Sequence, residues 1–189
     1  MTDQGRRRLA AIGGTIRAGS STERAMDIAA AAAAAEGIEV IRFDGAYIAR
    51  LPHYRGPDWS ADDGRAMIEA VRAADGLIIA TPGYHGTISG MVKNAIDYLE
   101  ELANDRRPYL EGRPVGLIAT AFGHQAANSS INTLRTIVHS LRGWPTPFGA
   151  ALQIDPDTFD ERGACLDAAI RDQLELVGRQ VAQGAGRLS

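Results

Sequence analysis

Short apolar runs alternate with longer helical segments along this chain. The runs cover residues 9–12, 39–43, 76–81, 114–120 and 148–154, and each is rich in Ile, Val, Leu or Ala. The intervening segments have helical periodicity, among them residues 22–36, 61–74, 90–102 and 160–182. Strands that alternate with helices in this way form a parallel sheet with helices on both faces. The pattern therefore predicts a doubly wound, three-layer α/β fold with five parallel strands.

Composition limits the number of domains and the kinds of partner. The chain has 189 residues, 45% of them hydrophobic, and no shift in composition marks a boundary, so residues 1–189 are predicted to form a single domain. A formal net charge of −3 provides no basic field for nucleic acid or for an anionic membrane surface. No apolar stretch reaches the roughly 18 residues of a membrane span. We expect a soluble, cytoplasmic protein that binds neither nucleic acid nor membrane.

The cysteine and the histidines carry little chemistry. Cys165 is the only cysteine, which excludes an internal disulfide, and its neighbours show no nucleophile pattern, so we interpret it as a small apolar filler. His53, His124 and His139 have no metal-ligand spacing with one another or with acidic residues. The sequence predicts no metal site.

Three loops follow the carboxyl ends of predicted strands, where open parallel sheets bind ligands. The first, residues 13–22, combines four hydroxyls with one arginine: Thr15, Ser20, Ser21, Thr22 and Arg17. Hydroxyls, helix N–H groups and a guanidinium suit a phosphate, although a Ser/Thr-capped helix with an exposed arginine has the same composition. The loop lacks both the Gly-Lys-Ser/Thr ending of a P-loop and the three-glycine dinucleotide spacing. A mononucleotide phosphate fits best.

The second loop, residues 82–89, should lie beside the first and face a flat ring. Tyr84 offers a rigid aromatic surface, and either Gly83 or Gly86 is expected to adopt positive φ. His85 is open to two interpretations, a ligand contact or a partly exposed loop histidine. The third loop is a turn of small residues over 121–125.

Two motifs resemble a known family. Residues 14–20 are similar to Gly-Ser-x-Arg-x-x-Ser, with Thr15 in place of the serine. Residues 82–87 and 92–97 are similar to Pro-x-Tyr-x-x-Ser/Thr running into Leu-Lys-Asn-x-x-Asp. Both occur in order in the NADPH-dependent FMN reductases, which include bacterial quinone, chromate and azo-dye reductases. The resemblance implies a flavodoxin-like fold with strand order 2-1-3-4-5.

The resemblance also implies a cofactor site for FMN. Thr15, Arg17, Ser20 and Thr22, with neighbouring Ser21, would hold the phosphate. The ribityl chain and ring would be flanked by Pro82, Gly83, Tyr84, His85, Gly86 and Thr87, with a third contact from Phe122 and Gly123. Gly83 stands where the family often has an acidic residue, and His85 where it often has asparagine.

The activity implied is an NAD(P)H-dependent FMN reductase without a catalytic side chain. Hydride passes from NADPH or NADH to the flavin, and then to free FMN, a quinone or a similar acceptor, with a flavin-dependent monooxygenase considered as a recipient of reduced FMN. The alternative is a flavodoxin-like electron carrier or a flavin-dependent interaction protein, without nicotinamide turnover. The family implies a homodimer or homotetramer through the helix that carries Lys93 and Asp97, which are also spaced as an intrahelical ion pair. Trp59 and Trp144 are open to two interpretations, lining the nicotinamide pocket or anchoring their loops in the core or an interface.

Overall fold

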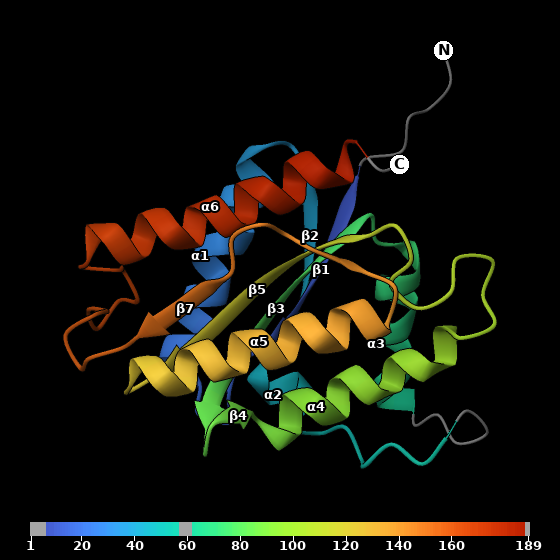
Figure 1. Ribbon diagram of the computed structural model, residues 1–189, viewed down its shortest axis with the longest axis horizontal. Helices are drawn as coiled ribbons and strands as arrows, with labels where there is room; N and C mark the ends of the chain where they lie inside the picture. Colours follow the sequence, from blue (N-terminus) through green and yellow to red (C-terminus); the bar gives the residue numbers. More distant parts are fainter. Residues whose placement is uncertain (1–6, 57–61, 188–189) are drawn as a thin grey trace.

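A twisted parallel sheet forms the middle layer of the structure, a computed structural model that describes residues 7–56 and 62–187 (Figure 1). Its main strands run in the order β2-β1-β3-β5, and two shorter strands, β6 and β7, lie along the outer side of β5. Their bounds are β1 Arg8–Gly13, β2 Glu39–Phe43, β3 Gly76–Tyr84, β5 Pro114–Ala121, β6 Trp144–Pro145 and β7 Ala150–Gln153. The predicted order 2-1-3-4-5 is confirmed, since β6 and β7 share the fifth position.

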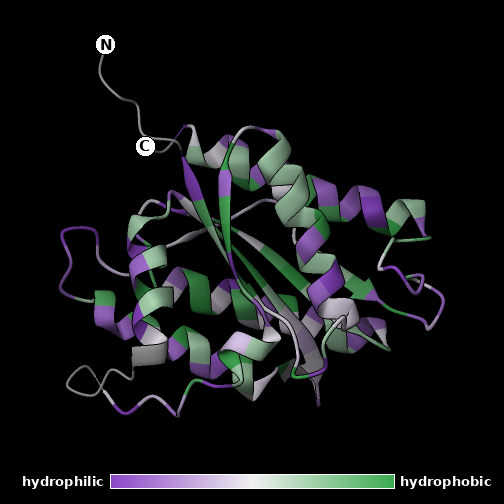
Figure 2. Ribbon diagram, turned by 180° about the vertical axis from the view of Figure 1, so that it is seen from behind, coloured by the Kyte–Doolittle hydropathy of each residue, from purple (hydrophilic) through white to green (hydrophobic). Residues whose placement is uncertain are grey.

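Helices cover both faces of this sheet. On one face α1 (Ser21–Ala35) packs against α6 (Ala168–Ala185). The other face carries α2 (Gly45–Ile48), α3 (Asp62–Ala73), α4 (Gly90–Asp97) and α5 (His124–Ser140). Each face has its own apolar core. Figure 2 shows apolar residues concentrated on the central strands and on the helix faces turned toward them. Such a three-layer arrangement leaves the strand ends as the place for a site.

Helix α1 shows why the alanine-rich segment folds as predicted. Ser20 caps its first turn, because the Ser20 Oγ accepts a hydrogen bond from the Glu23 N–H. Alanine has the highest helix propensity, and the small side chains let α6 approach closely. A Cβ added to Gly178 on α6 would lie 2.1 Å from the carbonyl oxygen of Ala29. The two helices therefore fix each other and the loop that precedes α1.

The second loop is a β-hairpin, which differs from the prediction of an irregular loop after a strand ending at residue 81. β3 continues to Tyr84 and pairs antiparallel with β4 (Thr87–Ile88). His85 and Gly86 have φ of 50° and 83°, the positive values that a tight two-residue hairpin turn requires. The glycine with positive φ is thus Gly86. The strand passes Pro82 because pairing with β4 supplies the hydrogen bonds beyond it.

Three element boundaries in the second half of the chain also differ from the predictions. The fifth strand is split around Pro147, which has no N–H to donate to a ladder. Helix α4 gives way to the 3-10 helix η1 (Tyr98–Leu102). The last helix begins at Ala168 instead of residue 160, because the Asp160 carboxylate accepts hydrogen bonds from two following N–H groups and closes a turn. Within the described residues no helix has the length and apolar character needed to cross a membrane.

Candidate functional site

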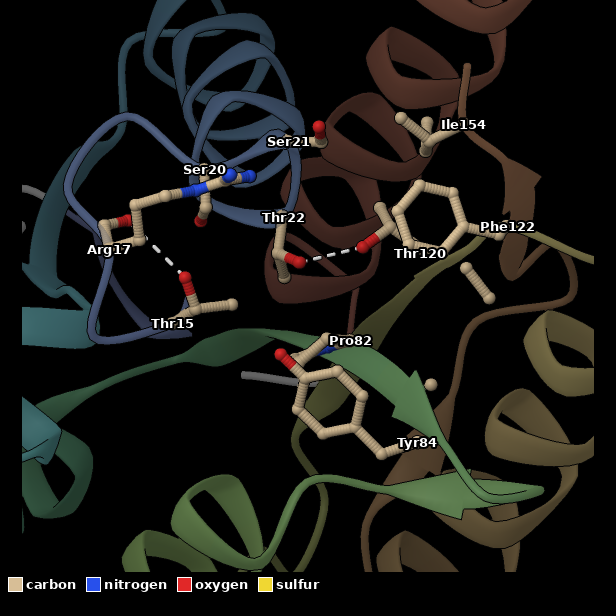
Figure 3. A pocket seen from close by; sticks show the side chains of 12 residues that line it. Thr15, Arg17, Ser20, Ser21, Thr22, Pro82, Tyr84, Thr120, Phe122 and Ile154 are labelled. Carbon is tan, nitrogen blue, oxygen red and sulfur yellow. Dashed lines mark hydrogen bonds between the residues drawn. The ribbon is translucent and has the colours of Figure 1, made fainter. Parts of the chain in front are cut away.

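A cavity of about 210 Å³ opens at the carboxyl ends of β1, β3 and β5 (Figure 3). The loop after β1, the hairpin after β3 and the turn after β5 all border it. It brings together nine of the residues predicted from the sequence: Thr15, Arg17, Ser20, Ser21, Thr22, Pro82, Gly83, Tyr84 and Phe122. Four others, His85, Gly86, Thr87 and Gly123, are exposed neighbours that do not line it.

Three lining residues were not predicted. Thr120 and Ala121 end β5, and Ile154 directly follows β7. A threonine at the carboxyl end of an apolar strand is a signal that could have identified Thr120. Ile154 carries no such signal, because only the pairing of β7 with β5 brings it to the cavity.

The loop after β1 turns sharply because its first two residues are glycines. Gly13 and Gly14 have φ of 155° and 115°. A Cβ on Gly13 would lie 2.1 Å from the carbonyl oxygen of Ala80, and one on Gly14 would lie 2.7 Å from the Gly45 nitrogen. The chain therefore passes close to β3 and to the start of α2. This close passage directs the following hydroxyl-rich segment over the strand ends.

The hydroxyls of this loop have separate roles. Ser20 is the cap of α1, as the alternative interpretation of the loop requires. The Thr15 Oγ1 donates to the Arg17 carbonyl oxygen at 3.2 Å. The hydroxyls of Thr22 and Thr120 lie 2.6 Å apart in a buried hydrogen bond that joins α1 to β5. Figure 3 shows these two threonines pointing toward each other across the cavity wall.

The start of α1 and Arg17 together form an electropositive wall. The N–H groups of the first helical turn have no intrahelical acceptors, and the Ser20 cap takes only that of Glu23. The N–H groups of Ser21 and Thr22 therefore remain for an anion at this helix start. Arg17 is exposed and lines the same cavity, so its guanidinium adds a positive charge there. This wall suits a phosphate group.

The hairpin forms the opposite wall and is fixed on α5. The Ser129 hydroxyl donates to the Gly86 carbonyl oxygen, and the hydroxyls of Thr87 and Thr133 lie 3.5 Å apart. A Cβ on Gly83 would lie 3.0 Å from the Ser130 Oγ and 3.1 Å from the Ala126 carbonyl oxygen. Glycine at this position therefore matches the close approach of α5.

Two aromatic rings stand exposed at the mouth of the cavity. Tyr84 on the hairpin is 53% exposed, and Phe122 after β5 is 88% exposed. Exposed rings of this size are costly in water and are available to stack on a flat ligand. The cavity is thus polar and electropositive at its α1 side and aromatic at its mouth.

Several residues singled out in the sequence lie away from this site. Trp144 pairs with Pro114 at the amino end of β5, about 20 Å along the strand from the cavity by strand geometry. It is 61% exposed and lies outside both this cavity and the core, so a role in an interface stays a prediction. Trp59 lies outside the described residues.

Cys165 is buried, as predicted for an apolar filler, and burial raises the pKa of its thiol. No cluster of three or more metal-ligating side chains occurs within residues 7–56 and 62–187.

An open, doubly wound parallel sheet with a phosphate-suited cavity at its carboxyl edge defines a mononucleotide-binding α/β protein. Comparison with known proteins gives the family. The family model described as NADPH-dependent FMN reductase matches residues 7–155, and the chain belongs to this family.

Curated relatives match part of this chain. An FMN-dependent NADPH-azoreductase of Staphylococcus haemolyticus (strain JCSC1435) is 40% identical over 79 residues, and one of Staphylococcus aureus (strain USA300) is 42% identical over 79 residues. Each match covers 42% of this chain and 38% of the relative. The chain therefore spans about two fifths of the length of these curated relatives.

Two solved structures share the fold over almost the whole chain. The flavoenzyme FerB, an NAD(P)H:(acceptor) oxidoreductase from Paracoccus denitrificans, has a TM-score of 0.79 and 19% identity over 96% of this chain and 98% of that chain. The apo form of the NADH:FMN oxidoreductase EmoB has a TM-score of 0.69 and 20% identity over 94% and 89% of the two chains. At these identities the similarity establishes the flavodoxin-like fold.

Proposed function

We propose that this protein is an NAD(P)H-dependent FMN reductase that takes hydride from NADPH or NADH and passes electrons to a small acceptor. The observation that carries the proposal is the cavity itself. It sets the start of α1 and Arg17 on one side and the Tyr84 hairpin on the other, in a chain of the FMN reductase family. The named relatives are FMN-dependent NADPH-azoreductases, which supports the same chemistry.

The residues of the cavity fit FMN in two parts. A phosphate monoester needs several donors and a compensating charge, and the first turn of α1 with Ser21 and Arg17 supplies both, while Thr15 lines the same wall. The flavin ring needs flat contacts and backbone polar groups, which Tyr84, Phe122 and the hairpin backbone offer. His85, Gly86, Thr87 and Gly123 belong to the proposed site as rim residues beside the ring.

The bound flavin would supply the hydride chemistry, so the protein's part is binding and orientation. Among the lining residues of the cavity, Arg17 and Tyr84 are the titratable ones. Among the described residues, no His, Asp, Glu, Lys or Cys side chain lines it. The proposed catalytic set therefore contains no side-chain acid or base, and the exposed mouth admits donor and acceptor in turn.

Acceptor, location and assembly are parts of the same proposal. Free FMN, a quinone or an azo compound would be the acceptor, with a flavin-dependent monooxygenase as one recipient of reduced FMN. Reduced nicotinamide is an intracellular donor, which supports a cytoplasmic location.

Residues 1–189 are proposed to be one domain that forms a homodimer or homotetramer through α4. Lys93 and Asp97 on α4 form an ion pair at 2.6 Å beside a hollow between α4 and α5.

Steady-state kinetics tests the proposed function. Purified protein supplied with FMN should bind the flavin and oxidise NADPH or NADH with a quinone or azo acceptor, following ping-pong kinetics. Bound flavin that nicotinamide does not bleach would indicate the electron carrier instead. Sedimentation at micromolar concentration should give at least a dimer mass, and a monomer mass would contradict the assembly.

A further inference from the structure

A second, larger hollow adjoins the proposed flavin site on the far side of Arg17. Its volume is about 400 Å³, against about 210 Å³ for the first. The two share four lining residues, Arg17, Ser21, Phe122 and Ile154, so they are parts of one continuous depression. Together they fall within the roughly 300–1,000 Å³ range of small-molecule and cofactor sites. The electropositive wall formed by the start of α1 and Arg17 therefore borders both hollows.

Arg24 gives the second hollow its own positive charge. This residue lies one turn into α1 and does not line the first cavity. Its Nη1 donates to the Asp160 carbonyl oxygen at 2.7 Å, which uses one of several guanidinium N–H donors. A Cβ on Gly19 would lie 3.7 Å from its Nη2, so the guanidinium stands between the loop after β1 and the segment after β7. Arg17 and Arg24 therefore both line this hollow, beside the wall that is proposed to hold the FMN phosphate.

The segment after β7 supplies the rest of the lining. Asp155 and Pro156 are exposed there, and Phe159 forms an apolar wall under the Arg24 guanidinium, 6.0 Å from its ring centroid. The segment is held by its own hydrogen bonds, since the Asp155 N–H donates to the Thr158 Oγ1 at 3.0 Å and the Leu166 N–H to the Thr158 carbonyl oxygen at 2.9 Å. These hydrogen bonds stabilise the segment that borders the hollow.

This set of groups matches the chemistry of an adenylate. Two arginines suit a second phosphate, and an exposed carboxylate accepts hydrogen bonds from the two hydroxyls of an unmodified ribose. Phe122 and Pro156 offer flat apolar surface to a base. The Asp155 carboxylate would repel a 2′-phosphate, so the ribose should carry free hydroxyls.

We infer that the second hollow is an adenylate subsite, which lets this protein bind FAD as well as FMN. The inference rests on the proposed function, because the adenylate of FAD extends from the phosphate that the first cavity is proposed to hold. NADH carries the same adenylate and is the other source of this group. FAD is favoured because its FMN half would occupy the first cavity, and its pyrophosphate would then lie at the wall that the two hollows share.

The test compares the affinities of flavin-free protein for FAD and FMN by fluorescence titration. Arg24→Met should raise the ratio of the FAD to the FMN dissociation constant by at least about tenfold, the scale of one charge-assisted hydrogen bond. Arg50→Met is the matched control. The Arg50 Nη1 also donates to a main-chain carbonyl oxygen, and its guanidinium also stacks on an aromatic ring, but it lines neither hollow. Its ratio should stay at the wild-type value.

A second variant covers the case in which Arg24→Met disturbs the segment it holds. Asp155→Asn changes an exposed side chain and should raise the same ratio about threefold or more, the effect of weakening hydrogen bonds to the ribose. The same proteins loaded with FMN are then mixed with NADH, and the NADH concentration that gives half of the maximal rate of flavin reduction reports the NADH affinity. An unchanged flavin ratio with weaker NADH binding in both variants would keep the subsite and assign it to the nicotinamide dinucleotide.

The remaining outcomes separate the two proposals. FMN binding with no change in either the flavin ratio or the NADH affinity would overturn the adenylate subsite and leave the proposed function intact. Failure of the wild-type protein to bind either flavin would overturn the proposed function, and this inference with it.

Discussion

The hydrogen bond between Thr22 and Thr120 should couple the phosphate loop to the sheet. Both residues are almost fully buried, at 2% and 5% exposure, and their hydroxyl oxygens lie 2.6 Å apart. Thr22→Val or Thr120→Val keeps the side-chain shape but leaves the partner hydroxyl buried without its bond. A buried hydroxyl left unsatisfied costs about 1–3 kcal/mol. Each single variant should lower the free energy of unfolding by about 2 kcal/mol.

The double variant should recover most of this loss. Replacing both partners by apolar groups of the same shape is nearly neutral, so the two changes together should cost well under the sum of the single ones. Urea unfolding of flavin-free protein measures the four free energies, and thermal midpoints of the single variants should fall by about 4–8 °C for a chain of this size.

A control variant tests whether the loss of stability is specific to the Thr22–Thr120 pair. Thr136→Val removes an exposed hydroxyl on α5 that donates to the Asn132 carbonyl oxygen, and it should change stability by less than about 0.5 kcal/mol. If the costs of Thr22→Val and Thr120→Val instead add in the double variant to within about 0.5 kcal/mol, the two hydroxyls are not bonded to each other and the reasoning is refuted.

Three further predictions concern single residues. Arg17→Ala should weaken FMN binding by about 1.5–3 kcal/mol, measured by flavin fluorescence, and unchanged affinity would remove Arg17 from the site. Arg113 is 1% exposed and donates to the carbonyl oxygens of Arg72, Ala74 and Tyr109, while burial lowers its pKa to about 10. Arg113→Met should lower the free energy of unfolding by about 2–4 kcal/mol in urea titrations without altering the flavin spectrum; a neutral effect would contradict its structural role. Because burial raises the pKa of Cys165, the folded state keeps its proton at pH values where the unfolded state loses it, so this thiol's contribution to stability is lost as pH rises. A thiol reagent at pH 8 should label Cys165 slowly in folded protein and fast in urea, and equal rates would contradict its burial.

Periodicity in the sequence was enough to predict the sheet. Residues 76–81, for example, are apolar at nearly every position, which is typical of a central parallel strand, and the structure buries them on both faces of the sheet. Boundaries were less predictable where side chains or pairing decide them. Asp160 delays the last helix by accepting two main-chain hydrogen bonds, and the pairing of β3 with β4 carries a strand past Pro82.

The candidate site divides along the same line. The sequence by itself determined the α/β architecture and the hydroxyl-rich loop with Arg17, because helix caps, glycine turns and strand periodicity are encoded within a few residues of one another. Only the tertiary structure decided that the Thr22 hydroxyl bonds to Thr120, that Ile154 lines the first cavity, and that Arg24 lines a second hollow beside that cavity. Those contacts join segments far apart in the chain, and their geometry exists only once the strands and helices have packed.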